Sequence, residues 1–440
     1  MILARWRVPL LAAIGVALVL AVVVGVLLLR SGAPIAQFMV TVCIAGLLWL
    51  AAVALVRRGD LPRWMVWFVV GIALTMRAMT LLASPLLSTD VYRYVWDGRV
   101  QMAGVNPYRY LPAAPELAFL RDGTVYPNIN RADYAPTIYP PAAEGIFALA
   151  AVAAPGVFGM KLVMLAFDVL ALGALAWLLH VAGRQPAELL IYAWLPLPVW
   201  EFAGSAHVDA AAAGLIALAL LAASRGRSVW TGILLALAAL TKFLPAVVLP
   251  AFWRRNDWRL PLAFGTTVLV LYIPYLSAGR QVLGFLGGYV SEEGVENGHG
   301  LFLLQLLGSV TVLPSWAGPA YIVVALALLA VLAGRFAFSV PMPAAAGPRV
   351  LLAARQAAIL GAVVLVVISP HYPWYFAWLA PLACLAPIPS ILWMLAAAPL
   401  LAHGAVETPI VPGAVYIPAG LLALRDLRRL PMFPHAIRSA

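Results

Sequence analysis

The sequence predicts an all-α protein that crosses a membrane many times. Of its 440 residues, 64% are hydrophobic and only 10% are charged, and its mean hydropathy is +0.98. A soluble domain has about 25% charged residues, so this chain could not cover a water-facing surface. Apolar runs of about 20 residues, the length that spans a bilayer, also recur along the chain.

The first apolar run, 8–29, is predicted to be a retained span and not a cleaved signal peptide. It follows a basic start that contains Arg5 and Arg7. It is longer than the roughly 7–15 apolar residues of a signal peptide, and no small-x-small cleavage site follows it.

The later apolar runs fall into two groups, which bring the prediction to about 12–14 transmembrane helices. The full-length runs are 36–56, 64–84, 157–181, 187–203, 208–223, 260–277, 316–334 and 350–368. The shorter or proline-broken runs are 229–253, 374–387, 389–402 and 409–424.

Arginines and lysines indicate the orientation, because cytoplasmic loops are enriched in them. The basic loops contain Arg5, Arg7, Arg57, Arg58, Arg63, Arg184, Arg225, Arg227, Arg254, Arg255, Arg259, Arg335, Arg425, Arg428 and Arg429. All of these lie on the cytoplasmic side, together with both termini, if 229–253 is a hairpin that turns near Thr241–Pro245, where proline breaks the helix. The alternative, one long span, would invert everything after it. The net charge of +11 resides in such loops and does not indicate nucleic acid as a partner.

This topology places the 85–156 segment outside the cytoplasm. The polar residues that do not serve as topology signals then gather on the outer side of the membrane, which indicates a functional site there. We divide the chain into two additional N-terminal spans (1–60), a core (61–430) whose first outer loop is 85–156, and a cytoplasmic tail (431–440).

The stretch STDVYRYVWDGRVQMAGVNPY, residues 88–108, concentrates polar side chains directly after an apolar run. Helical spacing puts one set of them on a single face: Asp90, Arg93, Tyr94, Asp97 and Gln101. We expect an amphipathic helix on the membrane surface, with Asp90 at the lipid–water boundary. The alternative role for Asp90 is a helix N-cap.

Other polar clusters are predicted on the same side. They are GVNPYRY with Asn106, TIYPP with Tyr139, EFAGSAHVDA with His207 and Asp209, SEEGVENGHG with Asn297, and SPHYPWY with His371, Trp374 and Tyr375. Tyrosine faces and amide groups suit a sugar, although each could also belong to a merely ordered loop. Lys242 and Arg280 suit a phosphate, Lys as a point charge and Arg as a bidentate fork. A solvated loop charge is the alternative for Arg280.

Two ionisable residues are expected deep within spans. Arg77 lies about two turns inside the third span, and Asp168 lies about three turns inside 157–181. Because ionisable groups in membranes are costly and usually paired or functional, we expect an Arg77–Asp168 pair. Lys161 is nearer the surface and is expected to extend its ammonium group toward water.

In this order, STDVYRYVWDGRVQMAGVNPY, TIYPP, AHVD, TKFLP and SPHYPWYFAWLAPL resemble the membrane glycosyltransferases of the GT-C superfamily. The chain is most similar to the bacterial polyprenyl-phosphate-mannose-dependent mannosyltransferases, over most of 64–400. The resemblance implies that Asp90 is the catalytic base, because it matches the acidic residue near the start of the first outer loop. His207-Val208-Asp209 resembles an HND-like segment, with Val where Asn is frequent. SPHYPWY resembles an HPWY-like segment near the lipid-phosphate site, with an inserted Tyr.

The implied activity is sugar transfer at the outer face of a bacterial inner (plasma) membrane. The donor would be a polyprenyl-phosphate sugar, with mannose as the expected sugar, and the acceptor a hydroxyl of a lipid or glycan. Asp90 would act as base in a single displacement that inverts the anomeric centre. The expected substrate contacts are Arg93, Tyr94, Asp97, Asn106, Tyr139, His207, Asp209, Lys242, Arg280, Asn297, His371, Trp374 and Tyr375. Membrane lipids are the remaining expected partner.

No cofactor is expected. Cys43 and Cys384 lie in apolar runs and indicate neither a disulfide framework nor a metal site. A divalent metal held by residues such as Asp90 and His207 stays an alternative, although the spacing matches no ligand motif.

Two other classes of protein compete with the enzyme. A transporter or flippase for a lipid-linked sugar would fit the broken 229–253 segment, but such proteins tend to show internal repeats, and none is found in this sequence. A non-catalytic scaffold would not need an Asp, Arg and His cluster on one side.

Overall fold

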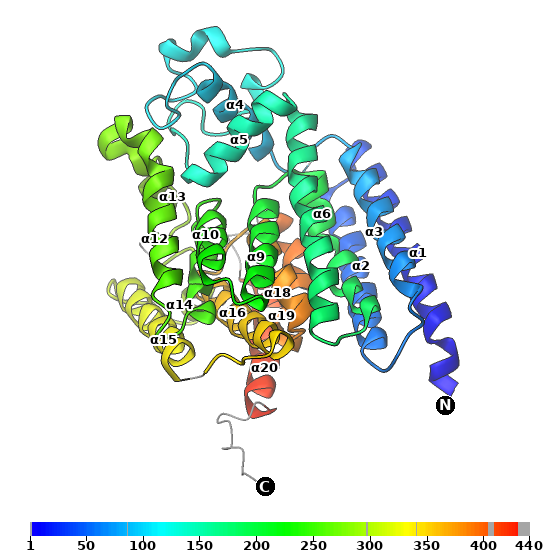
Figure 1. The fold of residues 1–440 in the computed structure, drawn as a ribbon. Helices are drawn as coiled ribbons and strands as arrows, with labels where there is room; N and C mark the ends of the chain where they lie inside the picture. Colours follow the sequence, from blue (N-terminus) through cyan, green and yellow to red (C-terminus); the bar gives the residue numbers. More distant parts are fainter. Residues whose placement is uncertain (1, 86, 296–297, 340, 404–408, 430–440) are drawn as a thin grey trace.

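The structure is a computed structural model that describes residues 2–85, 87–295, 298–339, 341–403 and 409–429. Every regular element within these ranges is a helix, so the predicted all-α membrane fold is confirmed. Figure 1 shows a bundle of long helices and, above one end of it, a layer that carries α4 (Asp90–Met102) and α5 (Pro141–Ala153), which we call the outer layer. The start of α1 and the end of α20 lie at the opposite end of the bundle.

Six helices of the described chain are long and apolar enough to cross a membrane, fewer than the 12–14 predicted. They are α1 (Ile2–Arg30), α2 (Ile35–Val56), α6 (Val157–Val181), the run Arg259–Glu292, α15 (Ala317–Ser339) and α16 (Ala346–Ile368). A seventh span results if the bent pair Pro196–Gly204 and Asp209–Ser224, which meet at 119°, is one crossing. The run Arg259–Glu292 contains α12 (Arg259–Tyr272), the 3-10 helix Ile273–Leu283 and α13 (Leu286–Glu292).

The number of long helices is lower because proline divides several predicted spans into short pieces. The predicted span 187–203 contains the 3-10 helix Pro186–Leu189, α7 (Leu190–Ala193), α8 (Pro196–Pro198) and a π-helix, Val199–Gly204. The other short or medium helices are α3 (Met65–Leu81), α9 (Asp209–Ser224), α10 (Ser228–Ala239), α11 (Leu249–Phe252), α14 (Phe302–Gly308), α17 (Trp374–Ala377), α18 (Ala380–Leu385), α19 (Pro389–Ala397) and α20 (Ile410–Arg429). The remaining 3-10 helices are Pro115–Leu120, Tyr126–Asn128, Leu244–Val248 and Ala398–His403.

The 229–253 region is a hairpin, as predicted. After α10 the chain turns, and Leu244–Val248 and α11 return along α16. The carbonyl of Leu240 accepts hydrogen bonds from the backbone N–H groups of Ala142 and Ala143, each at 3.0 Å, so the turn meets the start of α5. The turn therefore lies at the end of the bundle that faces the outer layer. Which side of a membrane this end faces stays a prediction.

The predicted Arg77–Asp168 pair is confirmed. Arg77 Nε lies 2.6 Å from Asp168 Oδ2, and both side chains are fully buried. The hydroxyl of Tyr192 donates to Asp168 Oδ1 at 2.6 Å, and Arg77 also donates to the carbonyl of Ala193 at 2.8 Å. The pair joins α3, α6 and α7 inside the bundle.

The expectation for Lys161 is wrong, because its ammonium group points into the protein. The side chain is buried, and Nζ donates to the carbonyls of Thr80 at 2.9 Å and Ala83 at 2.5 Å. These carbonyls belong to the end of α3, where helix geometry leaves acceptors without partners. Lys161 therefore caps α3 and does not extend toward water.

Candidate active site

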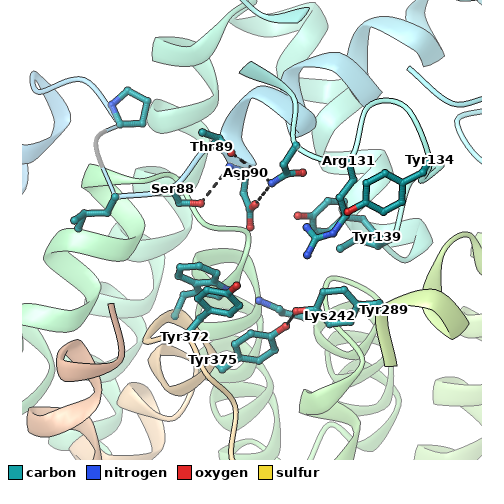
Figure 2. A pocket seen from close by; sticks show the side chains of 15 residues that line it. Ser88, Thr89, Asp90, Arg131, Tyr134, Tyr139, Lys242, Tyr289, Tyr372 and Tyr375 are labelled. Carbon is teal, nitrogen blue, oxygen red and sulfur yellow. Dashed lines mark hydrogen bonds between the residues drawn. The ribbon is translucent and has the colours of Figure 1, made fainter. Parts of the chain in front are cut away.

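A cavity of about 550 Å³ opens between the outer layer and the end of the bundle. Its lining consists of Pro85, Leu87, Ser88, Thr89, Asp90, Asn130, Arg131, Tyr134, Ile138, Tyr139, Lys242, Tyr289, Tyr372, Trp374 and Tyr375. Figure 2 shows Asp90 and Arg131 reaching into this space from the outer layer, with Lys242, Tyr372 and Tyr375 on the opposite side. The fold thus brings one carboxylate, two cations and a group of aromatic rings together from distant parts of the sequence.

Asp90 is the first residue of α4, and its carboxylate is directed away from the helix backbone. Its backbone N–H donates to Ser88 Oγ at 3.2 Å, and its Oδ1 accepts from Asn130 Nδ2 at 2.7 Å. The N-cap position belongs to Thr89, which makes no side-chain cap hydrogen bond, so the side chain that bonds the start of this helix is Ser88 and not Asp90. The N-cap alternative therefore does not describe this carboxylate, which is 19% exposed in the cavity.

His207 lies behind Asp90 and is fully buried. Its Nε2 is 3.9 Å from Asp90 Oδ2, and its Nδ1 is 2.8 Å from Glu201 Oε2. Its ring stacks on Trp374, with the centroids 4.2 Å apart. The local backbone explains this placement: the π-helix Val199–Gly204 ends beside Ala206, whose φ of 59° lies in the left-handed region and turns the chain toward α9.

Lys242 contributes a cation from the turn that follows α10. Its Nζ lies 2.9 Å from Oδ2 of Asp209, the first residue of α9. The same ammonium group lies 4.1 Å from the centroid of the Tyr375 ring, a distance typical of a cation–π contact. Asp209 is buried, while the Lys242 side chain is 17% exposed in the cavity. Asp209 therefore holds Lys242 in place without removing it from the cavity.

Arg131 is the second cation of the cavity. Its φ of 56° is unusual for a residue other than glycine, and the side chain lies between two partners. Nε is 2.8 Å from Glu292 Oε2, and the guanidinium carbon lies 5.6 Å from the centroid of the Tyr289 ring. These contacts connect the outer layer to α13.

Aromatic rings form the wall of the cavity below Asp90. Tyr372 stacks on Trp374 with centroids 4.5 Å apart and planes within 9° of each other. Because Trp374 also stacks on His207, three rings lie in a row that ends next to Asp90. A flat ring row beside a carboxylate offers a face to a sugar and a hydrogen-bond acceptor to its hydroxyls.

A second, smaller cavity adjoins the first and is mostly apolar. Its volume is about 280 Å³. The residues that it shares with the first cavity are Ile138, Tyr139, Lys242, Tyr289 and Tyr375. The rest of its wall includes Phe243, Leu244, Leu286 and Val290. Lys242 therefore stands where a polar space meets an apolar one.

The predicted polar face of α4 is partly wrong, because Arg93, Tyr94 and Asp97 do not line the cavity. They are buried against α5. Arg93 Nε lies 3.0 Å from Asp97 Oδ1, and Tyr94 stacks on Phe147 at 4.6 Å. The helices can approach closely because a side chain at Gly98 would place its Cβ 2.4 Å from the Phe147 carbonyl oxygen.

Glu144 of α5 completes this buried network. It accepts hydrogen bonds from Thr137 Oγ1 at 2.6 Å and from Gln101 Nε2 at 2.8 Å. Burial raises the pKa of Glu144 well above its ordinary value, and the charge of Asp97 adds to this effect. Burial also raises the pKa of Asp97, although Arg93 opposes the shift. The two carboxyl groups therefore favour holding a proton between them.

Three other predicted contacts lie away from the cavity. Asn106 Nδ2 donates to the Tyr275 carbonyl at 3.0 Å and joins the outer layer to the 3-10 helix Ile273–Leu283. Arg280 is exposed on the 3-10 helix that follows α12 and does not line the cavity. His371 lies 3.3 Å from Glu293 Oε2 and contacts the Gly300 carbonyl, so it holds the segment after α13. Asn297 lies outside the described residues.

Sequence reasoning placed Asp90, Tyr139, Lys242, Trp374 and Tyr375 among the site residues, and all five line the cavity. His207 and Asp209 lie directly behind them.

The prediction missed Asn130, Arg131 and Tyr289, which also line the cavity. Tyr372 lines it too; it stood in the predicted SPHYPWY cluster but was not among the expected contacts. The prediction also left Glu201 without a role, although Glu201 stands six residues before His207 in the same polar cluster. Only that proximity offered a signal in the sequence.

The described residues contain no group of three or more His, Cys, Asp or Glu side chains placed to hold a metal ion. Independence from a metal stays a prediction.

An all-helical membrane fold with a carboxylate, cations and aromatic rings at one end agrees with the predicted GT-C type of membrane glycosyltransferase, and comparison with known proteins shows the family. The chain belongs to the alpha-(1→6)-mannopyranosyltransferase N-terminal domain family, whose model matches residues 3–254. The predicted resemblance is therefore confirmed. The match includes both N-terminal helices, as well as Asp90, His207, Asp209 and Lys242.

One relative is the alpha-(1→6)-mannopyranosyltransferase A of Mycobacterium tuberculosis, strain H37Rv. The two chains are 26% identical over 353 residues, which are 71% of this chain and 65% of the relative. The match thus covers slightly less than two thirds of the relative's length. No solved structure matches the chain.

Proposed function

We propose that this protein is a membrane mannosyltransferase that transfers mannose from a polyprenyl phosphate to a hydroxyl of a lipid or glycan acceptor. The observation that carries the proposal is the pair of adjoining cavities, one polar with Asp90 and one apolar, with Lys242 in the wall between them. A donor with a sugar, a phosphate and a hydrocarbon tail needs these three environments in this order. The family of the chain supports mannose as the sugar.

In the proposed arrangement the phosphate lies next to Lys242 and Arg131, and the first isoprene units enter the apolar cavity. The sugar then lies against the Tyr372–Trp374 rings and points toward Asp90. Two fixed cations in a site partly shielded from water stabilise the charge that develops on the phosphate as its bond to the sugar breaks. Lys242 is suited to this role because Asp209 fixes its position while its ammonium group still faces the cavity.

Asp90 acts as the general base. Its carboxylate takes the proton of the acceptor hydroxyl as that oxygen bonds to the anomeric carbon, and the bond from that carbon to the phosphate oxygen breaks. The polyprenyl phosphate leaves as an anion, so no acid has to protonate it. The incoming oxygen enters opposite the leaving phosphate, so one displacement inverts the anomeric centre. Asn130 holds Oδ1, and His207 lies beside Oδ2, so both orient the carboxylate.

The test compares two aspartates of the outer layer. Asp90→Asn keeps the size of the side chain but removes the base, and turnover should fall about 10²-fold or more. Asp133→Asn is the matched control, because Asp133 is exposed two residues after Arg131 and does not line the cavity. Release of polyprenyl phosphate from labelled polyprenyl-phosphate mannose is measured with purified protein in detergent, in the presence of a membrane glycan fraction.

Nearly full activity of the Asp90→Asn variant would remove Asp90 as the base. A wild-type protein that releases no polyprenyl phosphate in detergent, but moves labelled donor across sealed vesicles, would instead be a flippase. An outer-face reaction is tested separately by supplying the acceptor on only one side of oriented vesicles.

A further inference from the structure

A third cavity, of about 520 Å³, lies at the end of the bundle opposite the outer layer. It is enclosed by α16, the loop between α18 and α19, and α20. Arg57 at the end of α2 and Arg184 just after α6 also line it. No residue of the proposed active site reaches it, so it is a separate feature of the molecule.

Arg355 is the most informative residue of this cavity. It lies nine residues after the start of α16, well inside one of the helices long enough to cross a membrane. Its side chain is exposed, and within the described chain it makes no hydrogen bond or ion pair. On the same helix, Arg349 donates to the carbonyls of Pro343 at 2.9 Å and Ala344 at 2.6 Å. Arg355 is exposed on the surface of the bundle, so at this depth its guanidinium group is open to an anionic partner from the membrane, which would offset the cost of placing a charge there.

The other charges of the cavity leave a positive surplus. Arg184 pairs with Glu188, and Arg57 makes only a long contact, 3.5 Å, with the Pro387 carbonyl. One carboxylate lines the space: Asp426 Oδ2 accepts the backbone N–H of Ser390 at 3.2 Å. With Glu188 counted beside Arg184, three guanidinium groups stand against two carboxylates, and the remaining positive charge favours an anion.

The apolar part of the cavity indicates what this anion is attached to. Leu351, Arg355, Ile359, Ala362 and Val363 all line it, and their spacing places them on one face of α16. The apolar stripe continues from Arg355 toward the middle of the helix for two turns. A free phosphate would make no favourable contact with such an apolar stripe, whereas an acyl chain would pack against it.

We propose that this cavity binds an anionic phospholipid, with its phosphate between Arg355, Arg57 and Arg184 and an acyl chain along Ile359 and Val363. Guanidinium groups suit a phosphate because their planar forks can donate two parallel hydrogen bonds. Basic pockets between membrane helices are known to hold such head groups. The site joins α16 to α20, and the lipid acts as a bridge between them.

The experiment measures lipid retention by native mass spectrometry of the purified full chain in detergent. Wild-type protein mixed with equal amounts of phosphatidylglycerol and phosphatidylcholine should retain one phosphatidylglycerol in preference to phosphatidylcholine. Arg355→Leu should lower this retention at least about ten-fold, since a charge-assisted hydrogen bond contributes roughly 1.5–3 kcal/mol. Arg58→Leu is the control, because Arg58 is an exposed neighbour of Arg57 that does not line the cavity.

A second variant keeps every charge and tests the acyl-chain part. Ala362→Trp fills the apolar stripe and should lower retention as strongly as Arg355→Leu, which also covers the case in which Arg355→Leu does not fold. Inorganic phosphate in millimolar excess should not displace the lipid. The proposal is overturned by equal retention of both lipids, by full retention in both cavity variants, or by displacement with inorganic phosphate, which would identify a soluble anion as the ligand.

Discussion

Two pairs of one cation and one buried aspartate, Arg77–Asp168 and Lys242–Asp209, differ in how completely their atoms are bonded. In the bundle, Asp168 is bonded by Arg77 and Tyr192, and Arg77 also donates to the backbone. At the cavity, Asp209 Oδ1 has no hydrogen-bond partner in the described chain, and Lys242 remains partly exposed. The first pair is closed within the protein, whereas in the second pair the ammonium group of Lys242 still faces a cavity.

The difference indicates which buried charges hold the fold and which ones prepare a site. A closed pair offsets its own desolvation, and removing one partner leaves the other charge buried. An incomplete pair at a cavity keeps a cation fixed and available to a ligand, which is the preorganisation that a catalytic site needs. Each pair can therefore be tested by changing one residue and then both.

The largest effect is expected in the closed pair. Arg77→Leu leaves the Asp168 carboxylate without its cation and should cost about 3–5 kcal/mol of stability. Replacing both residues by Leu should recover part of this loss, and the folded protein should then turn over near the wild-type rate. Thermal unfolding in detergent measures the change. The readout is the fraction of protein that stays monodisperse after heating. A double variant no more stable than the worse single variant would show that the two residues are not coupled.

The open pair should respond in the opposite way. Lys242→Gln combined with Asp209→Asn removes both charges, so stability should stay close to wild type, but turnover should fall about 10²-fold because a cation next to the leaving phosphate is lost. Turnover and thermal unfolding are measured on the same preparation. If the double variant keeps its activity, Lys242 belongs to the fold and not to the site.

These two pairs also show what the sequence could and could not reveal. The depth of a residue within an apolar run can be counted from the sequence, which is why Arg77 and Asp168 were paired correctly. The direction of a polar helix face cannot be counted in this way. Asp97 shares a face with Asp90 on α4, yet Gly98 lets α5 pack closely and bury Asp97, while Asp90 reaches the cavity.

Loop cations were harder still to place, since a loop's position depends on distant contacts. Arg131 and Arg280 both lie in polar segments between helices, and sequence reasoning chose Arg280 as the phosphate ligand. The structure places Arg131 in the cavity because Glu292 and Tyr289 of α13 hold it there. No local sequence pattern predicts the contact between Arg131 and Glu292, which are 161 positions apart.

The choice between these two arginines gives a smaller but sharp test. Arg131→Ala should raise the KM for the donor about ten-fold, the loss of roughly one charge-assisted hydrogen bond. Arg280→Ala is the matched control and should leave the KM unchanged. Initial rates at varied donor concentration separate KM from kcat. The opposite result, with only the Arg280 variant impaired, would restore the prediction made from the sequence.

The smallest effect concerns the third buried cluster, which contains two carboxyl groups, Asp97 and Glu144, and one cation, Arg93. Burial first, and then the charge of Asp97, raises the pKa of Glu144 above its ordinary value of 4.5. Between pH 4.5 and this raised value the folded protein holds a proton that the unfolded chain has released. Stability should therefore fall as the pH rises through this window, by about 1.4 kcal/mol for each unit by which the pKa is raised.

Glu144→Gln replaces the protonated acid by a neutral group and should flatten this dependence while leaving turnover at low pH unchanged. The melting temperature in detergent is followed from pH 5 to pH 8 for wild type and variant, with Glu116→Gln as the control, because Glu116 is an exposed carboxylate of the same outer layer. A pH dependence that is the same in the Gln variant and in wild type would mean that Glu144 is ionised in the folded protein. The cluster would then resemble the closed Arg77–Asp168 pair, because the charge of Arg93 would balance a carboxylate. Asp97 and Glu144 would not share a proton.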